Sequence, residues 1–165
     1  MNPISEGLRS PRQLGLLPAR MALGSTMVFH GAKKLVGEGP EEHAQMFGAM
    51  GIRPPKLLAV STGVAEVLAG AMSIAGVFTR FAALAVLVTQ GMAIAKVHGP
   101  KGFNNQEGGF EFNLALMAIA AGLLLAGPGK ISAHEVLERR TQSCARLFLT
   151  PRKRQRRLRA IRLLK

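Results

Sequence analysis

Four long apolar stretches, separated by short polar segments, dominate the pattern of the chain. They run from Gln13 to Ala32, Leu57 to Thr79, Phe81 to Ala95 and Phe112 to Gly129. A helix needs about 20 mainly apolar residues to span a bilayer, and each stretch meets or approaches that length. The pattern predicts an all-α fold, a bundle of four transmembrane helices.

A soluble bundle with buried helices is the main alternative. Its helices should carry a polar stripe at a period of 3.6 residues. Phe81–Ala95 offers only Thr89 and Gln90, and Ile119–Ala126 has no polar residue. Helices that are apolar all round lie in lipid or deep inside a large protein, and 165 residues make a small protein. The membrane interpretation is therefore preferred.

The connections between the stretches differ in kind. Only Arg80 separates the second stretch from the third, which predicts a tight helical hairpin. The first connection ends in Pro54 and Pro55, where a helix start tolerates proline. The third, residues 97–110, is rich in Gly, Pro and Asn and is typical of a turn-rich loop.

Charge divides the chain into two parts. The net charge is +13, and 12 of the 22 basic residues lie between Lys130 and Lys165. That segment holds only Glu135 and Glu138 as acids, so it contributes +10. We expect a membrane domain over residues 1–134 and a basic tail over residues 135–165 that is partly helical.

The distribution of basic residues predicts the orientation in the membrane. With four spans both termini share a side, which would carry 16 Lys and Arg residues against six on the other. Both termini should therefore be cytoplasmic. A cleaved signal peptide is disfavoured because Arg20 interrupts the first apolar stretch.

The basic tail predicts a partner of opposite charge. Leu158 and Ile161 interleave with arginines, as in an amphipathic helix on a membrane surface. Anionic headgroups attract each basic residue by about 1 kcal/mol, and an acidic partner protein is the alternative. Nucleic acid is disfavoured, because no aromatic residues interleave for base stacking. The expected binding residues are Arg152, Lys153, Arg154, Arg156, Arg157, Arg159 and Arg162.

Glu66 lies near the middle of the second stretch. A charge at the bilayer centre costs at least about 2.5–3.5 kcal/mol, so Glu66 should face the bundle interior and find a partner or a proton. Arg20 is the cationic candidate in the first stretch. A proton or quinone-ligand site and a structural pin between helices are both compatible with this glutamate.

Small residues share helix faces with the acids of the membrane part. Because small residues let transmembrane helices approach closely, Glu66 and Glu111 should face neighbouring helices rather than lipid. The small residues are Gly63 and Gly70 beside Glu66, and Ala115, Ala118 and Gly122 beside Glu111.

No motif assigns a catalytic residue or a metal site. His30, His43 and His98 have no metal-ligand spacing, so no metal is expected. The single Cys144 cannot form an internal disulfide. The candidate polar or ligand-binding residues of the membrane part are Glu66, Arg20, His30, Arg80, Gln90, His98 and Glu111.

A series of short motifs carries a family resemblance. They are HGAKKL (30–35), GIRPP (51–55), GVAEVLAG (63–70), GVFTR (76–80), AIAKVH (93–98), GGFE (108–111) and GPGK followed by Ser132. In this order and spacing, over residues 15–132, the chain resembles the DoxX family of small bacterial membrane proteins.

The resemblance implies a four-helix bundle in the bacterial plasma membrane and a link to redox chemistry. The family takes its name from a subunit of a thiosulfate:quinone oxidoreductase. Some relatives are described as membrane anchors for a complex of superoxide dismutase with a sulfurtransferase, an enzyme pair linked to redox stress. Glu66, Arg80, His98 and Glu111 match recurrent motif positions, but the family has no defined catalytic set to carry over.

Two functions therefore stay open. One is a membrane subunit or anchor of an oxidoreductase complex, with a quinone as the only cofactor suggested. The other is a non-catalytic scaffold whose basic tail recruits soluble redox or detoxification enzymes. Whether the chain is an enzyme is left undecided; other membrane subunits or a second copy are further candidate partners. A small transporter is less favoured, because inverted repeats and broken helices are not evident.

Overall fold

The computed structural model describes residues 11–138, with side chains from Gly15 onward. This part of the chain is entirely helical apart from its turns. Its helices are α2 (Pro11–Leu35), α3 (Gly39–Ala49), α4 (Pro55–Ala75), α5 (Thr79–Ala93), the π-helical turn η1 (Ile94–His98), the 3-10 turns η2 (Gly99–Lys101) and η3 (Asn105–Glu107), and α6 (Glu111–Ala126). A last helical segment begins at Ala133 and is described to Glu138.

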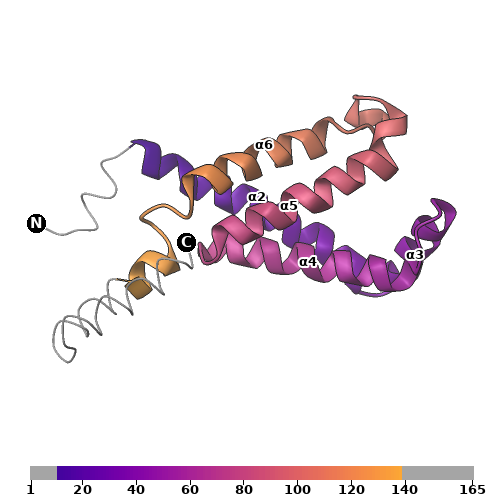
Figure 1. The fold of residues 1–165 in the computed structure, drawn as a ribbon, viewed down its shortest axis with the longest axis horizontal. Helices are drawn as coiled ribbons and strands as arrows, with labels where there is room; N and C mark the ends of the chain where they lie inside the picture. Colours follow the sequence, from indigo (N-terminus) through magenta and orange to yellow (C-terminus); the bar gives the residue numbers. More distant parts are fainter. Residues whose placement is uncertain (1–10, 139–165) are drawn as a thin grey trace, which may run out of the picture.

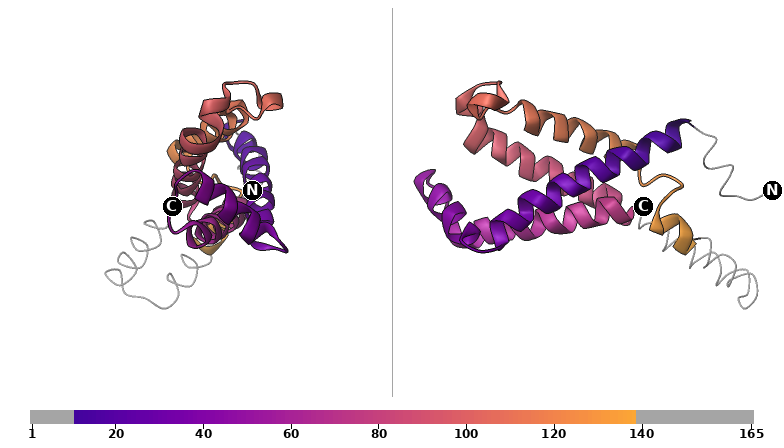
Figure 2. Two further views of the ribbon diagram at one scale, coloured as in Figure 1. Left: turned by 90° about the vertical axis from the view of Figure 1, so that its right-hand side faces the viewer. Right: turned by 180° about the vertical axis from the view of Figure 1, so that it is seen from behind.

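The long helices form two pairs. α2 packs chiefly on α4, and α5 packs chiefly on α6. The pairs meet near the α4–α5 turn and diverge toward the end where α3 and the α5–α6 connection lie (Figures 1 and 2). We call the end with the α4–α5 turn the narrow end, and the end with α3 the splayed end.

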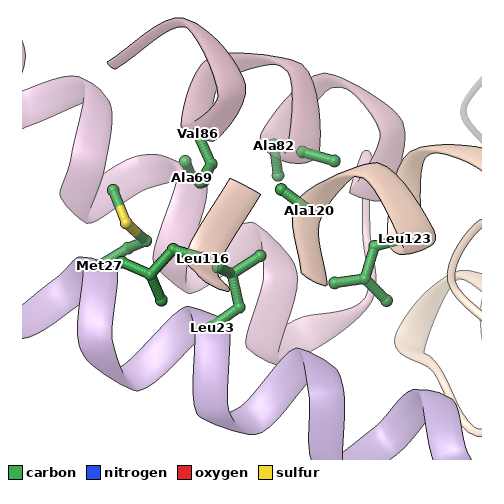
Figure 3. Close-up of a cluster of buried hydrophobic side chains, with 9 residues drawn as sticks. Leu23, Met27, Ala69, Ala82, Val86, Leu116, Ala120 and Leu123 are labelled. Carbon is green, nitrogen blue, oxygen red and sulfur yellow. The ribbon is translucent and has the colours of Figure 1, made fainter. Parts of the chain in front are cut away.

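The core lies where the two pairs meet. All four long helices contribute, and four of the nine contributed side chains are those of alanine (Figure 3). The fully buried set is Leu23, Met27, Ala69, Ala82, Ala83, Val86, Leu116, Ala120 and Leu123.

Glycines set the contact between α2 and α4. A Cβ on Gly24 would lie 2.7 Å from the carbonyl oxygen of Gly70, and one on Gly70 would lie 2.6 Å from that of Gly24. Gly31 lies seven residues after Gly24, and Gly63 lies seven residues before Gly70. A Cβ on Gly31 would lie 2.6 Å from the carbonyl oxygen of Gly63. The two backbones therefore touch at two levels, a packing that small residues permit in membranes.

The α4–α5 turn lies earlier than the sequence indicates. α4 ends at Ala75, Gly76 caps it at φ 70°, and Phe78 precedes α5 at φ 51°. Thr79 and Arg80 therefore belong to α5. The expectation that Arg80 alone separates the two helices is wrong, because α4 ends at a left-handed glycine cap, and its last residue lies four residues before the end of the apolar pattern.

Two helices of residues 11–138 are long and apolar enough to cross a membrane. They are Pro55–Ala75, with 21 residues, and the continuous helical stretch Thr79–Lys101, with 23. Only 33% and 22% of their apolar windows are buried, so most of the apolar surface faces outward. α6 is apolar but has 16 residues, and α2 carries polar residues along its length. Of the four expected spans, length and composition support two.

Candidate functional site

Glu66 is buried between α2 and α4, and its partner is Lys34. The Nζ atom of Lys34 donates a hydrogen bond to Oε2 of Glu66, and the two side chains are 15% and 5% exposed. The expected interior position of Glu66 is thus confirmed, whereas Arg20 as its partner is wrong. α2 continues past Ala32 to Leu35 and crosses α4 in antiparallel fashion, which brings Lys34 beside Glu66.

Arg20 lies at the opposite end of α2 and binds backbone oxygens. Its side chain is 2% exposed. The Nε atom donates to the carbonyl of Ser73 (2.8 Å), and Nη2 donates to that of Ile74 (2.6 Å). Nη1 donates to the carbonyls of Pro128 (2.9 Å) and Ile131 (2.6 Å). Arg20 therefore forms its hydrogen bonds at the narrow end of the bundle and is not the partner of Glu66.

His30 lies one turn before Lys34 on α2 and extends the polar region. Its backbone oxygen accepts a hydrogen bond from Nζ of Lys34 (3.4 Å). Its exposed ring lies 6.0 Å from the ring of Phe112, at the start of α6, and 5.6 Å from Phe29. His30, Lys34 and Glu66, with Phe112 beside them, form what we call the polar cluster.

A second polar contact joins the helix pairs. Nδ2 of Asn113 donates to Oε1 of Gln90 (2.7 Å), and Nε2 of Gln90 contacts Sδ of Met27 (3.6 Å). Gln90 and Asn113 are 6% and 7% exposed. Sequence reasoning chose Gln90 and missed Asn113, although Asn113 is the only polar side chain after Glu111 in α6.

The remaining candidates lie apart from the polar cluster. Nδ1 of His98 is 2.7 Å from the carbonyl oxygen of Gly108, which ties the α5–α6 connection together. Oε1 of Glu111 accepts from the backbone N–H of Asn105 (3.0 Å) in the same connection. Arg80 is exposed on α5. The motif positions at the splayed end therefore shape a loop.

The two small-residue faces have different surroundings. Gly63 and Gly70, beside Glu66, are buried against α2. Ala115, Ala118 and Gly122 of α6 are exposed, and a Cβ on Gly122 would meet no atom within 4 Å. The expectation that this face of α6 contacts a neighbouring helix is wrong for the described chain, because α6 turns its opposite face, with Leu116 and Ala120, to the core.

The chemistry of the polar cluster is that of hydrogen bonding and proton exchange. The ammonium of Lys34 and the carboxylate of Glu66 are largely buried, where charged groups interact more strongly than in water. The imidazole of His30, one turn away on α2, is exposed. Among residues 11–138, no group of three or more His, Cys, Asp or Glu side chains could hold a metal ion. The tail residues from Arg152 to Arg162 and Cys144 lie outside the described residues.

Comparison with known proteins gives one match. The family model described as DoxX matches residues 15–99, which include α2 to α5 and all of the polar cluster except Phe112. No curated protein and no solved structure matches the chain.

Proposed function

Because this chain belongs to the DoxX family of membrane proteins, we propose that it is the membrane subunit or anchor of an oxidoreductase complex and that it binds a quinone at the polar cluster. The observation that carries the proposal is the exposed His30 ring beside the buried Lys34–Glu66 pair. Polar groups inside a membrane bundle are costly and commonly mark a functional site.

The chemistry of a quinone fits these side chains. Its two carbonyl oxygens need hydrogen-bond donors, which the His30 ring and the Lys34 ammonium provide. Its flat ring suits the face of Phe112, 6.0 Å from His30. Because His30 and Phe112 are both exposed, the isoprenoid chain of the quinone can stay in lipid while the ring enters between α2 and α6.

Each residue has a separate role in this proposal. Lys34 orients one quinone oxygen and is itself held by Glu66. His30 contacts the ring directly and can exchange a proton with it when the quinone is reduced or oxidised. The electron donor is a partner subunit or a soluble reductant.

Binding can be tested with the purified protein in nanodiscs. A short-chain ubiquinone or menaquinone analogue is titrated against the unaltered chain, His30→Ala and Lys34→Met. We expect both variants to weaken binding at least about tenfold, the effect of one lost hydrogen bond to a charged or desolvated group. His43→Ala is the matched control, because His43 lies on α3 and its Nδ1 contacts only the carbonyl oxygen of Gly39 (2.8 Å). Equal affinity in all four proteins would rule out a quinone at the cluster.

The second candidate function is a scaffold that recruits soluble redox enzymes through the basic tail. Its support is the charge of +10 carried by residues 130–165. Glu138 is buried, so the tail should be removed after this residue. Deleting residues 139–165 should abolish co-purification of partners from native membranes. A full-length variant with Arg152, Arg154, Arg156 and Arg157 changed to Gln separates charge from length, and unchanged partner recovery would refute recruitment.

The proposal includes four spans with both termini in the cytoplasm. α2 has 25 residues and is about 37 Å long at 1.5 Å per residue, enough for a bilayer. α6, with 16 residues, is about 24 Å long and would need local thinning of the membrane. In this arrangement the narrow end faces the cytoplasm and the tail meets anionic headgroups.

A further inference from the structure

We propose that residues 127–138 form a clasp that Arg20 holds closed across the narrow end, and that this clasp opens locally while the bundle stays folded. It follows α6 directly and ends in the helical segment Ala133–Glu138 (Figure 1). This inference concerns neither the polar cluster nor the quinone and stands independently of them.

The guanidinium of Arg20 is the link between the clasp and the bundle. It joins two carbonyls of the last turn of α4, at Ser73 and Ile74, to two carbonyls of the clasp, at Pro128 and Ile131. The carbonyls at a helix end lack the N–H partners of a following turn, because α4 ends at Ala75 and α6 at Ala126. The carbonyl of Ser73 also accepts from the backbone N–H of Gly76 (3.2 Å). The side chain of Arg20 thus donates hydrogen bonds both to carbonyls at the end of α4 and to carbonyls of the segment that follows α6.

The fit around the guanidinium is tight. A Cβ on Gly76 would lie 2.4 Å from Nη2 of Arg20 and 2.6 Å from Cβ of Ser132. Only glycine leaves room for the clasp to lie against the α4–α5 turn. Gly76 is therefore a position where a single methyl group would displace both the guanidinium and the clasp, with Arg20 itself unsubstituted.

Side-chain contacts of the clasp complete the closed arrangement. Oγ of Ser132 accepts from the backbone N–H of Glu135 (3.2 Å) and donates to the carbonyl of Gly129 (2.9 Å), so Ser132 starts the final helical segment. The next turns bury His134 at 1% and Glu138 at 7% exposure. The contacts that join the clasp to the bundle are those with Arg20 and Gly76.

The closed clasp also carries an energetic penalty. Nε2 of His134 is buried without a hydrogen-bond partner among the described residues, and Oε2 of Glu138 is 3.8 Å from it. No described carboxylate lies within ion-pair distance of Arg20, whose four acceptors are neutral carbonyls. Polar atoms that are buried and unpaired lose hydration, which opening would restore. Such a segment belongs to the low-stability end of a fold.

Opening would have a defined consequence for the chain. The basic residues from Arg139 onward follow the clasp directly. A closed clasp holds residues 128–132 at Arg20 and Gly76, and an open clasp releases them from the bundle. The clasp is therefore a conformational device that sets how far the tail reaches.

Hydrogen exchange of the full chain in nanodiscs tests the clasp. Arg20→Lys keeps the charge, but a single ammonium cannot reproduce the planar set of four bonds. We expect amide exchange in residues 128–138 and in the last turn of α4 to become about tenfold faster or more, with α5 and the start of α6 unchanged. Exchange equal to that of the unaltered chain would overturn the clasp.

A second pair of variants guards against general unfolding. Gly76→Ala places a methyl group against Arg20 and Ser132, whereas Gly51→Ala imposes the same left-handed strain, at φ 75°, with no atom within 4 Å. Faster exchange confined to residues 128–138 in Gly76→Ala, and absent from Gly51→Ala, supports the clasp. Equal exchange in this segment for both variants overturns it.

Discussion

At the scale of single residues, the Lys34–Glu66 pair is the most consequential contact of the membrane part. A buried ion pair is costly to form, but breaking it by removing one partner leaves an unpaired charge, which costs more. Lys34 is 15% exposed and Glu66 is 5% exposed, so both are largely withdrawn from water. The pair joins α2 to α4 near the splayed end.

A double-mutant cycle tests this pair. Lys34→Met and Glu66→Gln should each lower the free energy of unfolding by roughly 3 kcal/mol, because each strands the other group. The double variant should recover most of that loss. The measurement is denaturation in mixed micelles, followed by helix content.

The exposed pair Lys56–Glu41 is the control for this cycle. Its side chains are 63% and 61% exposed, so Lys56→Met should change stability by less than about 1 kcal/mol. If Lys34→Met, Glu66→Gln and their double variant were all as stable as Lys56→Met, the buried pair would have no special role.

Asn113 provides a prediction on a neutral contact. Asn113→Ala leaves Oε1 of the buried Gln90 without its donor, and interhelical hydrogen bonds in membranes contribute about 0.6 kcal/mol on average. We expect a loss of roughly 1 kcal/mol in the same unfolding assay, since the amide is also left unpaired. Asn105→Ala, in the exposed connection, should leave stability unchanged, and a loss there of equal size would contradict this reasoning.

The sequence revealed the need for a partner to Glu66 but not which partner. Lys34 lies two residues beyond the end of the first apolar stretch, so the hydrophobic pattern assigns it to the connection. The helix continues by one further turn to Leu35, and a hydrophobic pattern does not show where such a turn ends. Arg20 was closer to the centre of the stretch, but the antiparallel crossing places it at the narrow end.

At the scale of helices, the number and order of the apolar elements followed from the sequence. The residues at which these helices begin and end could not be predicted, because local caps and turns determine them. Phe78 adopts φ 51°, which is uncommon for a residue with a side chain. A phenylalanine at this position does not predict a turn. The glycines of α2 and α4 were visible in the sequence, but their pairing required the crossing of the two helices.

The glycine contacts between α2 and α4 make a prediction on packing. Gly70→Ala should destabilise the protein by about 1–3 kcal/mol, because the added methyl group meets the backbone of Gly24 and Val28 at 2.6–2.8 Å. Thermal unfolding in detergent measures the effect.

Gly122→Ala is the matched control for this packing. The position is helical and open, with no atom within 4 Å of the new methyl group. Alanine there should raise stability by about 0.5–1 kcal/mol, since it lowers the entropy of the unfolded chain. Equal effects at Gly70 and Gly122 would show that the close approach of α2 and α4 does not matter.

At the scale of the whole molecule, the two ends of the bundle are chemically different. The narrow end holds the α4–α5 turn and the clasp, which leads to the basic tail. The splayed end holds α3 and the α5–α6 connection, with the exposed Lys56–Glu41 pair and the edge-to-face rings of Phe103 and Phe110, whose centroids are 5.4 Å apart. The proposed topology places the narrow end in the cytoplasm, because the positive-inside rule assigns the basic termini to that side.

The single cysteine of the chain makes this topology directly testable. Cys144 lies in the basic tail, six residues beyond the last described residue. A membrane-impermeant maleimide should leave it unlabelled in intact cells and label it after the membrane is permeabilised. In a Cys144→Ser background, Gln106→Cys places a thiol in the exposed α5–α6 connection and should be labelled in intact cells. The predicted orientation depends mainly on the basic residues of the tail. Labelling of this pair of thiols instead tests the membrane side of both ends of the bundle. Labelling of Cys144 and of Gln106→Cys from the same side would require an even number of spans between them, where the four-helix arrangement has one span, α6, and it would exclude that arrangement.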